Sequence, residues 1–419
     1  MTNRALALIG FIALSLSTRT TMAQTTYTYN NTAGAWSDQT HWLSVPGGFP
    51  NSATSIALFN GSNTYNVDVD GTYDILALQF GASQTGTINV RAGSVGSTHL
   101  LRLNPGVGAN GSILANDGKT TLFLAAGSGN QTIGTTPGNA AGLFLGGGSV
   151  GTPANHVWEI QGSTTLTVNG QISANPGTNN TLTKVGSGTL TLAASNAASQ
   201  PWNGGLIVSQ GAVVLNGGSA AAGTGPVTVN SGATLNGRGT INMPNASTFT
   251  TIKSGGTLSP GIGTGTAAAL TITADAGNTG GLIMDATSIL SIKLFGTGAT
   301  DIGLVTVNGN ATINTNKLTL DLNGISATTL RTATGGSPRT YTVLTASNNL
   351  GGSGFDSSGF MITNQGSFSP GEWSFGSFDM GVGAVTLNFT PVPETKSMLA
   401  IAAALLLAGY QLRKNIVLA

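Results

Sequence analysis

The stretch Leu182-Thr-Lys-Val-Gly-Ser-Gly-Thr-Leu-Thr-Leu192 decides the fold. Its last three residues alternate apolar with polar side chains, which is the pattern of a β-strand with one buried face. Its two glycines supply the backbone freedom that a tight corner requires. The same alternation returns along the chain, in Val227-Thr-Val229, Leu270-Thr-Ile272, Val305-Thr-Val307, Leu318-Thr-Leu320-Asp-Leu322 and Val385-Thr-Leu387-Asn-Phe389. The sequence therefore predicts short strands joined by turns.

This strand-and-corner unit repeats at a nearly constant interval. Copies begin at residues 162, 187, 211, 232 and 255, with a looser one at 280, so the intervals are 25, 24, 21, 23 and 25 residues. A period of this length fits one coil of a parallel β-helix, whose rungs bury their apolar faces on each other. Chance alignment in a glycine-rich chain is the alternative, and the regular spacing disfavours it. We predict an all-β, right-handed parallel β-helix-like solenoid of about fifteen rungs, roughly 70 Å long, over most of residues 24–390; a two-sheet sandwich array is the other candidate.

The opening stretch also carries a family resemblance. Together with Trp202-Asn-Gly-Gly-Leu-Ile-Val208 and Gly211-Ala-Val-Val-Leu215, it resembles the autotransporter-associated β-strand repeat. That resemblance implies a β-helical stalk of the kind found in surface proteins. An autotransporter ends in a large translocator barrel, whereas this sequence ends in a short apolar stretch, so we do not expect self-export through an outer membrane.

Composition excludes several classes of protein. Only 7% of the 419 residues are charged, the formal net charge is +1, and 63 residues are glycine. A long helical bundle or coiled coil needs charged helix formers and little glycine. Nucleic-acid binding needs a basic patch that this sequence lacks. Cysteine is absent, so disulfides and thiolate metal sites are excluded.

The N-terminus has the pattern of a secretory signal peptide. Arg4 provides the positive charge, residues 5–16 form an uncharged apolar stretch, and Thr21 and Ala23 provide the small residues of a cleavage site. We expect cleavage between Ala23 and Gln24. The alternative is an N-terminal membrane anchor, but twelve residues of helix span only about 18 Å of a ~30 Å hydrocarbon core.

The C-terminus has a second targeting pattern. Pro391-Val-Pro-Glu394 precedes an apolar stretch, residues 398–412, which Arg413 and Lys414 follow. This arrangement resembles the PEP-CTERM sorting signal of bacteria that make exopolysaccharide, which an exosortase, a membrane transpeptidase, reads. The motif here is Val392-Pro393-Glu394-Thr395, so the second proline of the family is missing, and the basic cluster is thin. A plain C-terminal anchor is the alternative.

These patterns divide the chain into five segments. They are a signal peptide (1–23), an N-terminal β-rich or β-helical region (24–160), a β-strand repeat solenoid (161–340), a C-terminal β cap (341–390) and a sorting tail (391–419) with a transmembrane helix at about 397–414. The segment Gly34–Trp42, followed by Pro50, resembles the head of exported repeat proteins. Aromatic residues are expected to close the other end of the stack, namely Phe355, Phe360, Phe368, Phe375, Phe378 and Phe389.

Candidate chemical groups are few. His41, His99 and His156 lie more than fifty residues apart and form no metal motif. Asn66-Val-Asp68-Val-Asp70-Gly71 matches the start of a calcium loop, which makes Asp68 and Asp70 a weak calcium candidate. The twelfth position of that loop, where a bidentate Glu is needed, is Ala77. A strand with its valines inward, its aspartates outward and a glycine turn explains the same residues.

The sequence thus favours a structural or adhesin-like surface protein over an enzyme. The rival is a β-helix carbohydrate-active enzyme, a lyase or hydrolase, built on the acidic cluster Asp68, Asp70 and Asp74 with nearby Arg91. The five tryptophans are candidates for stacking on sugar rings, although buried positions are commoner. We expect no catalytic residue, no cofactor and no nucleic-acid partner. The expected partners are the Sec translocon, signal peptidase, an exosortase-like transpeptidase and exopolysaccharide.

Overall fold

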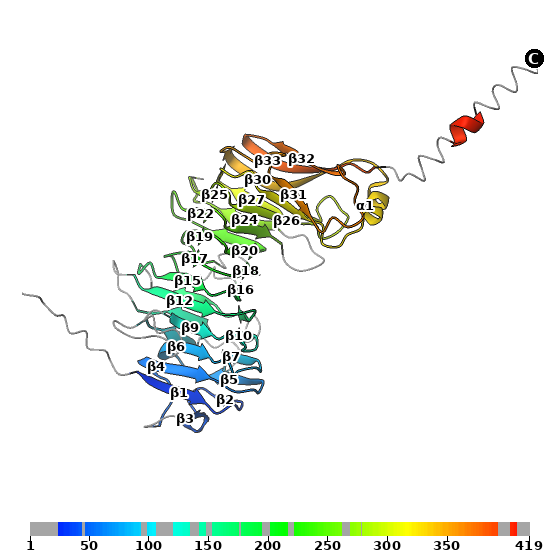
Figure 1. The fold of residues 1–419 in the computed structure, drawn as a ribbon. Coiled ribbons are helices and arrows are strands. Elements are labelled where there is room, and N and C mark those ends of the chain that lie inside the picture. The colour runs from blue at the N-terminus through cyan, green and yellow to red at the C-terminus, as the bar shows by residue number, and fades with distance from the viewer. Residues whose placement is uncertain are drawn as a thin grey trace, which may run out of the picture.

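The computed structural model describes residues 24–43, 47–93, 99–105, 120–134, 142–147, 153–175, 177–194, 202–216, 222–261, 269–277, 279–392 and 403–408. Strands of these residues stack into an elongated solenoid, with β1–β3 at one end and β30–β33 at the other (Figure 1). Two sheets, here sheet A and sheet B, form its two walls. The predicted all-β parallel solenoid is confirmed, and the sandwich array is not found.

Sheet B forms one wall of the solenoid and has twelve strands among the described residues. Its strands are parallel and follow each other in chain order. At 4.7–4.9 Å per strand the wall is about 53 Å long. This is shorter than the roughly 70 Å expected for fifteen rungs. Its strands are β2 (Gly34–Ala35), β5 (Tyr65–Val69), β7 (Ile88–Ala92), β10 (Gln131–Ile133), β13 (Thr165–Val168), β16 (Thr189–Leu192), β18 (Ala212–Leu215), β20 (Thr234–Gly237), β23 (Thr257–Pro260), β26 (Ile289–Lys293), β29 (Leu318–Asp321) and β31 (Phe360–Thr363).

Sheet A contains two side-by-side ladders of parallel strands. One ladder runs β1–β4–β6–β9–β12–β15–β17–β19–β22–β25–β28–β30. The other consists of β6–β8–β11–β14 and of β21–β24–β27–β30, so the long strands β6 and β30 belong to both ladders. The strands are β1 (Thr25–Tyr29), β3 (Trp42–Leu43), β4 (Ser52–Phe59), β6 (Tyr73–Phe80), β8 (Leu100–Leu103), β9 (Thr120–Leu124), β11 (Gly142–Leu145), β12 (Asn155–Ile160), β14 (Ile172–Ala174), β15 (Thr181–Val185), β17 (Leu206–Val208), β19 (Val227–Val229), β21 (Gly239–Asn242), β22 (Phe249–Ile252), β24 (Ala269–Thr273), β25 (Gly281–Met284), β27 (Leu304–Asn308), β28 (Asn310–Ile313), β30 (Arg339–Gly351), β32 (Trp373–Phe378) and β33 (Gly381–Phe389).

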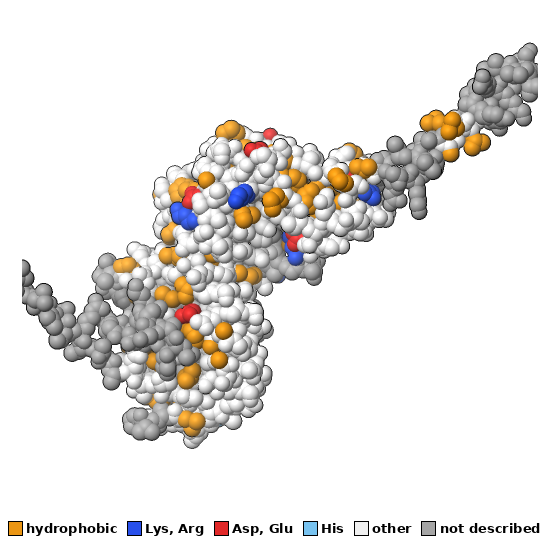
Figure 2. Space-filling view, in the orientation of Figure 1, with side chains coloured by type: hydrophobic (Ala, Val, Ile, Leu, Met, Phe, Trp, Pro, Cys, Tyr) orange, Lys and Arg blue, Asp and Glu red, His pale blue; other side chains and the backbone are white. Residues whose placement is uncertain are grey.

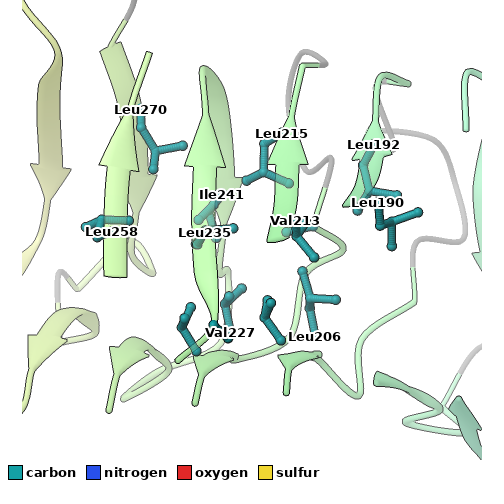
Figure 3. Close-up of a cluster of buried hydrophobic side chains, with 14 of the residues drawn as sticks. Leu190, Leu192, Leu206, Val213, Leu215, Val227, Leu235, Ile241, Leu258 and Leu270 are labelled. Atoms are coloured by element: carbon teal, nitrogen blue, oxygen red, sulfur yellow. The ribbon is translucent and has the colours of Figure 1, made fainter. Parts of the chain in front are cut away.

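The repeated leucine of the sequence motif forms a column in the core. Leu166, Leu190, Val213, Leu235 and Leu258 are direct partners on successive strands of sheet B, and all are fully buried. Side chains from sheet A, such as those of Leu206, Val227 and Ile241, lie in the same cluster (Figure 3). The period predicted from the sequence is therefore correct for these five copies.

The prediction of a sixth copy of the repeat at Gly280 is wrong. The strand that pairs with Leu258 in sheet B contains Leu290, which lies 32 residues further along the chain. Gly281 instead begins β25 and pairs with Phe249 in sheet A. The coil is longer here mainly because eight residues separate β23 from β24, whereas one residue separates β20 from β21 in the coil before, and a fixed period cannot register such an insertion.

Aromatic residues close the N-terminal end. The head segment folds as β2, a short 3-10 helix at Gln39–His41, and β3. The rings of Tyr29 and Trp42 lie 4.8 Å apart, and those of Trp36 and Trp42 lie 4.9 Å apart. The indole nitrogen of Trp36 donates to the Pro50 carbonyl over 3.0 Å. The segment thus covers the first rung, as a capping element must.

The C-terminal end is closed by antiparallel strands. β33 pairs with both β30 and β32. Phe355, Phe368 and Phe389 are buried there, and Phe360, Phe375 and Phe378 pack against the core while partly exposed. These aromatic side chains thus pack at the C-terminal end of the stack, where the sequence predicts a cap. The boundary at 340/341 falls inside β30, and no break separates residues 24–160 from the repeats, because β10 pairs with β13 and β12 with β15.

One short helix, α1 (Ala327–Thr334), interrupts the β structure, which the all-β prediction for residues 24–390 did not include. Ser326 caps its N-terminus by accepting the Thr329 amide, and Gly335 ends it in the left-handed conformation. Only Ala327 and Leu330 of this helix are buried. With two buried residues the helix leaves almost no periodic signal in the sequence, which explains why it was missed.

Candidate functional site

The two aspartates considered for calcium lie at the end of β5. Val67 and Val69 point inward and are fully buried, whereas Asp68 and Asp70 are not. Ala77, at the twelfth position of the hypothetical loop, is buried within β6. These residues therefore form a strand with its valines inward, as the alternative to a calcium loop predicts.

Both carboxylates have partners within the protein. Asp68 accepts from the Arg91 guanidinium over 2.6 Å, and these two residues are direct partners on β5 and β7. Asp70 accepts from the Ser37 hydroxyl and from the Tyr73 hydroxyl. Partial burial raises the pKa of Asp70, but these hydrogen bonds outweigh it and the net shift is downward. No group of three or more His, Asp or Glu residues that could hold a metal ion occurs in the described ranges.

The three histidines occupy different environments. A ring nitrogen of His41 lies 2.9 Å from the Thr32 hydroxyl, and one of His99 lies 2.9 Å from the Val69 carbonyl. His156 is fully buried in β12, where its Nε2 lies 2.9 Å from the Gly146 carbonyl. Burial lowers the pKa of His156 to about 4, so its ring is neutral at physiological pH.

The tryptophans are not available for stacking on sugars. Trp36, Trp158 and Trp202 have no exposed surface, and Trp42 and Trp373 are each 4% exposed. They fill the core and the two caps, where large rings contribute most to burial. The hypothesis that they bind sugar rings is therefore wrong.

Lys184 has a structural role that the sequence analysis missed. It lies in the inward row of β15 beside Leu182 and is fully buried. Its ammonium donates to the carbonyl oxygens of Gly186, Gly188 and Gln210, so all three N–H groups have acceptors. Burial lowers the pKa of Lys184 to about 8. The alternation of polar and apolar residues in this strand places Lys184 at a position where an apolar residue is expected. A charged residue at such a position was the signal from which its burial could have been predicted.

A second buried charge lies where the chain leaves the C-terminal cap. Glu372 is fully buried, and its carboxylate accepts two hydrogen bonds from Arg331 of α1, over 2.7 and 2.8 Å. It also accepts the backbone amides of Ser369, over 2.7 Å, and Val392, over 3.0 Å. Burial raises the pKa of Glu372, but the hydrogen bonds, first that from Arg331, lower it below the ordinary value.

A groove lies beside this ion pair. It has a volume of about 350 Å³ and is lined by Thr328, Arg331, Thr332, Gly335, Gly336, Pro391 and Val392. A Cβ added to Gly335 or Gly336 would meet nothing within 4 Å, so the α1 side of the groove is open. Val392 is 41% exposed. The groove thus joins α1 to the first residue of the predicted sorting motif.

Most of the predicted targeting residues lie outside the described part of the chain. This applies to Ala23 at the cleavage site and to Pro393, Glu394, Thr395, Arg413 and Lys414 in the tail. Gln24 is described and is half-buried directly before β1. Residues 403–408 form a helix with exposed leucines. Among the described helices, none has the length and apolar character needed to span a membrane.

No protein-family model matches the chain, and no curated protein matches it.

Proposed function

We propose that the protein is an exported bacterial surface or extracellular-matrix component, structural or adhesin-like in role and associated with exopolysaccharide. The observation that carries this proposal is the outer face of sheet B, where hydroxyl-bearing side chains repeat in register. Thr165 pairs with Thr189, Thr167 with Thr191, and Thr234 with Thr257, while Ala212 and Val214 of β18 interrupt the two rows between these pairs. The visible surface of the protein carries few charges, and some of them lie in pairs of opposite sign (Figure 2). Repeated neutral contacts of this kind suit a polymer rather than one small substrate.

Sheet B is the more regular of the two walls. Its strand pairs carry no register shift from β5 to β31. Sheet A has shifts between β12 and β9 and between β4 and β6. Adjacent hydroxyls of one row on sheet B are about 4.8 Å apart, and the two rows are about 6.6 Å apart. An extended neutral polysaccharide, which also repeats its hydroxyls every few ångströms, can therefore make the same weak contact with the hydroxyls on either side of β18.

Export and sorting complete the proposal. The Sec translocon and signal peptidase would remove residues 1–23, and β1 begins at Thr25, immediately after the expected new N-terminus at Gln24. The tail would then hold the protein in the inner membrane until an exosortase-type enzyme cleaves it. The body ends at Phe389 of β33, just before Pro391, so the whole solenoid lies between the two signals. A right-handed coil is expected because parallel crossover connections are nearly always right-handed.

Mass spectrometry of the mature protein tests the location. We expect an N-terminus at Gln24 and no peptide from Met398 onward. An intact segment from Leu399 to Lys414 in the mature protein would show that the tail is a permanent anchor instead.

Polysaccharide co-sedimentation tests the role. The double variant Thr167→Val, Thr191→Val is expected to bind less exopolysaccharide than the wild type, without loss of thermal stability. The matched control is Thr271→Val, Thr306→Val, which changes a partnered outward threonine pair on sheet A. Equal binding by both double variants would contradict the assignment to sheet B. Cleavage of polysaccharide that Asp68→Ala or Asp70→Ala abolishes would establish the enzyme alternative.

A further inference from the structure

The Glu372 carboxylate connects three parts of the C-terminal end. Arg331 belongs to α1, Ser369 to the loop before β32, and Val392 to the segment after β33. In addition, the Glu372 carbonyl accepts the Thr390 amide over 2.7 Å. Two hydrogen bonds that Glu372 accepts thus hold the backbone of the chain where it leaves the cap.

Burial of this ion pair is a poor source of stability. Taking a carboxylate and a guanidinium out of water costs several kcal/mol per ion, and apolar residues of similar volume often serve as well. Such a pair instead fixes the relative orientation of its two side chains, because the planar guanidinium and the carboxylate fit each other in one bidentate arrangement. The backbone amide of Val392 is tied to that fixed carboxylate, so the exit direction of the chain is fixed too.

The fixed exit direction of the chain matters because a groove lies beside the Arg331–Glu372 ion pair. One wall of the groove is Pro391 and Val392, and the opposite wall is the exposed end of α1 with Thr328, Thr332 and two glycines. A protein that contacts the Val392 side chain from solvent therefore meets the hydroxyls and bare backbone of α1 at the same time. Such a surface fits a partner loop that inserts an apolar side chain and hydrogen-bonds to the rim.

We propose that Arg331 and Glu372 form a clamp that presents Val392, together with the groove beside α1, to the enzyme that processes the tail. The inference rests on the proposed sorting function. It adds that the enzyme binds the folded body as well as the motif, so that processing is coupled to completion of the C-terminal cap. Glu372 is then a positioning residue, and the groove is the contact surface.

Processing in the native host tests the contact surface and the clamp together. Glu372→Gln removes the charge of the clamp, and Thr332→Trp fills the groove from an exposed position on α1. Both variants are expected to accumulate the uncleaved precursor and to be cleaved about tenfold more slowly, which corresponds to 1.4 kcal/mol. Two controls are expected to be processed like the wild type. Ala333→Trp changes an exposed residue of α1 away from the groove lining, and Asp285→Asn breaks the surface ion pair with Lys253.

Amide hydrogen exchange on the purified full-length chain separates the clamp from the groove. Glu372→Gln is expected to speed exchange in the peptide containing Thr390 and Val392 while β33 keeps its protection. Thr332→Trp is expected to leave that peptide protected. If the wild-type tail is cleaved, and both variants are cleaved at the wild-type rate, the clamp proposal is wrong while the sorting function stands. If the wild-type tail is never cleaved, the sorting function fails and the clamp proposal fails with it.

Discussion

Acid should destabilise the solenoid through His156, well before its carboxylates are protonated. The ring is fully buried in β12, and burial lowers its pKa from 6.5 to about 4. In the unfolded chain His156 therefore takes up a proton near pH 6.5, whereas in the folded chain it stays neutral down to about pH 4. The stabilising effect of the neutral ring is complete above pH 6.5 and is lost as the pH falls from 6.5 towards 4.

The size of the effect follows from these two pKa values. Between pH 7.5 and pH 5 the free energy of unfolding should fall by about 2 kcal/mol, out of a total near 3 kcal/mol for the whole window. Urea denaturation at pH 7.5, 6.5, 5.5 and 5.0 measures this slope directly. The pH range stays above the region where Asp and Glu residues normally titrate.

A variant isolates the histidine from other groups. His156→Leu removes the titrating ring, and the Gly146 carbonyl that accepted from it keeps the Asn180 side chain at 3.2 Å. This variant should therefore fold and lose most of the slope between pH 7.5 and pH 5. His41→Asn, which changes a partly exposed histidine in the N-terminal cap, should keep the slope. An equal slope in the wild type and in His156→Leu would refute the reasoning.

Three further predictions concern stability and are measured by urea denaturation with matched controls. Gly186→Ala should lower the free energy of unfolding by at least 2 kcal/mol more than Gly232→Ala. Both glycines have positive φ, but of the two only Gly186 would place an added Cβ 2.3 Å from a backbone oxygen. Equal losses in the two variants would contradict the steric argument. Leu235→Ala should cost about 2–5 kcal/mol, because it opens a cavity in the column of inward side chains, and a loss below 1 kcal/mol would show that neighbouring coils collapse into the gap. Lys184→Met should cost about 1–3 kcal/mol by leaving buried carbonyls without a donor, whereas Lys317→Met, at an exposed position, should change stability by less than about 0.5 kcal/mol.

The repeats were predictable because burial acts on every coil in the same way. Leu166, Leu190 and Leu258 face the same core, so each coil needs an apolar residue at that place, and the sequence shows it as a period. The caps were predictable for a related reason, since open ends of a solenoid must be covered and aromatic residues cluster at both termini. Where the coil lengthens, as between Leu258 and Leu290, β24 and β25 still bury apolar side chains, but burial does not fix the number of residues between one strand and the next. The register there could not be read from a period.

The C-terminal junction could not be predicted, because nothing in the sequence relates its members. Arg331 and Glu372 are 41 residues apart, and Glu372 and Val392 are 20 apart. Neither distance matches the repeat. A glutamate in a chain with only three of them is conspicuous, but its partner depends on α1, which itself has a weak sequence signal. In a solenoid the regular part of the sequence records what every coil shares. Contacts made once, at the end of the stack, leave no such record, and it is at that end that this chain brings together a helix, a buried charge and the start of its tail.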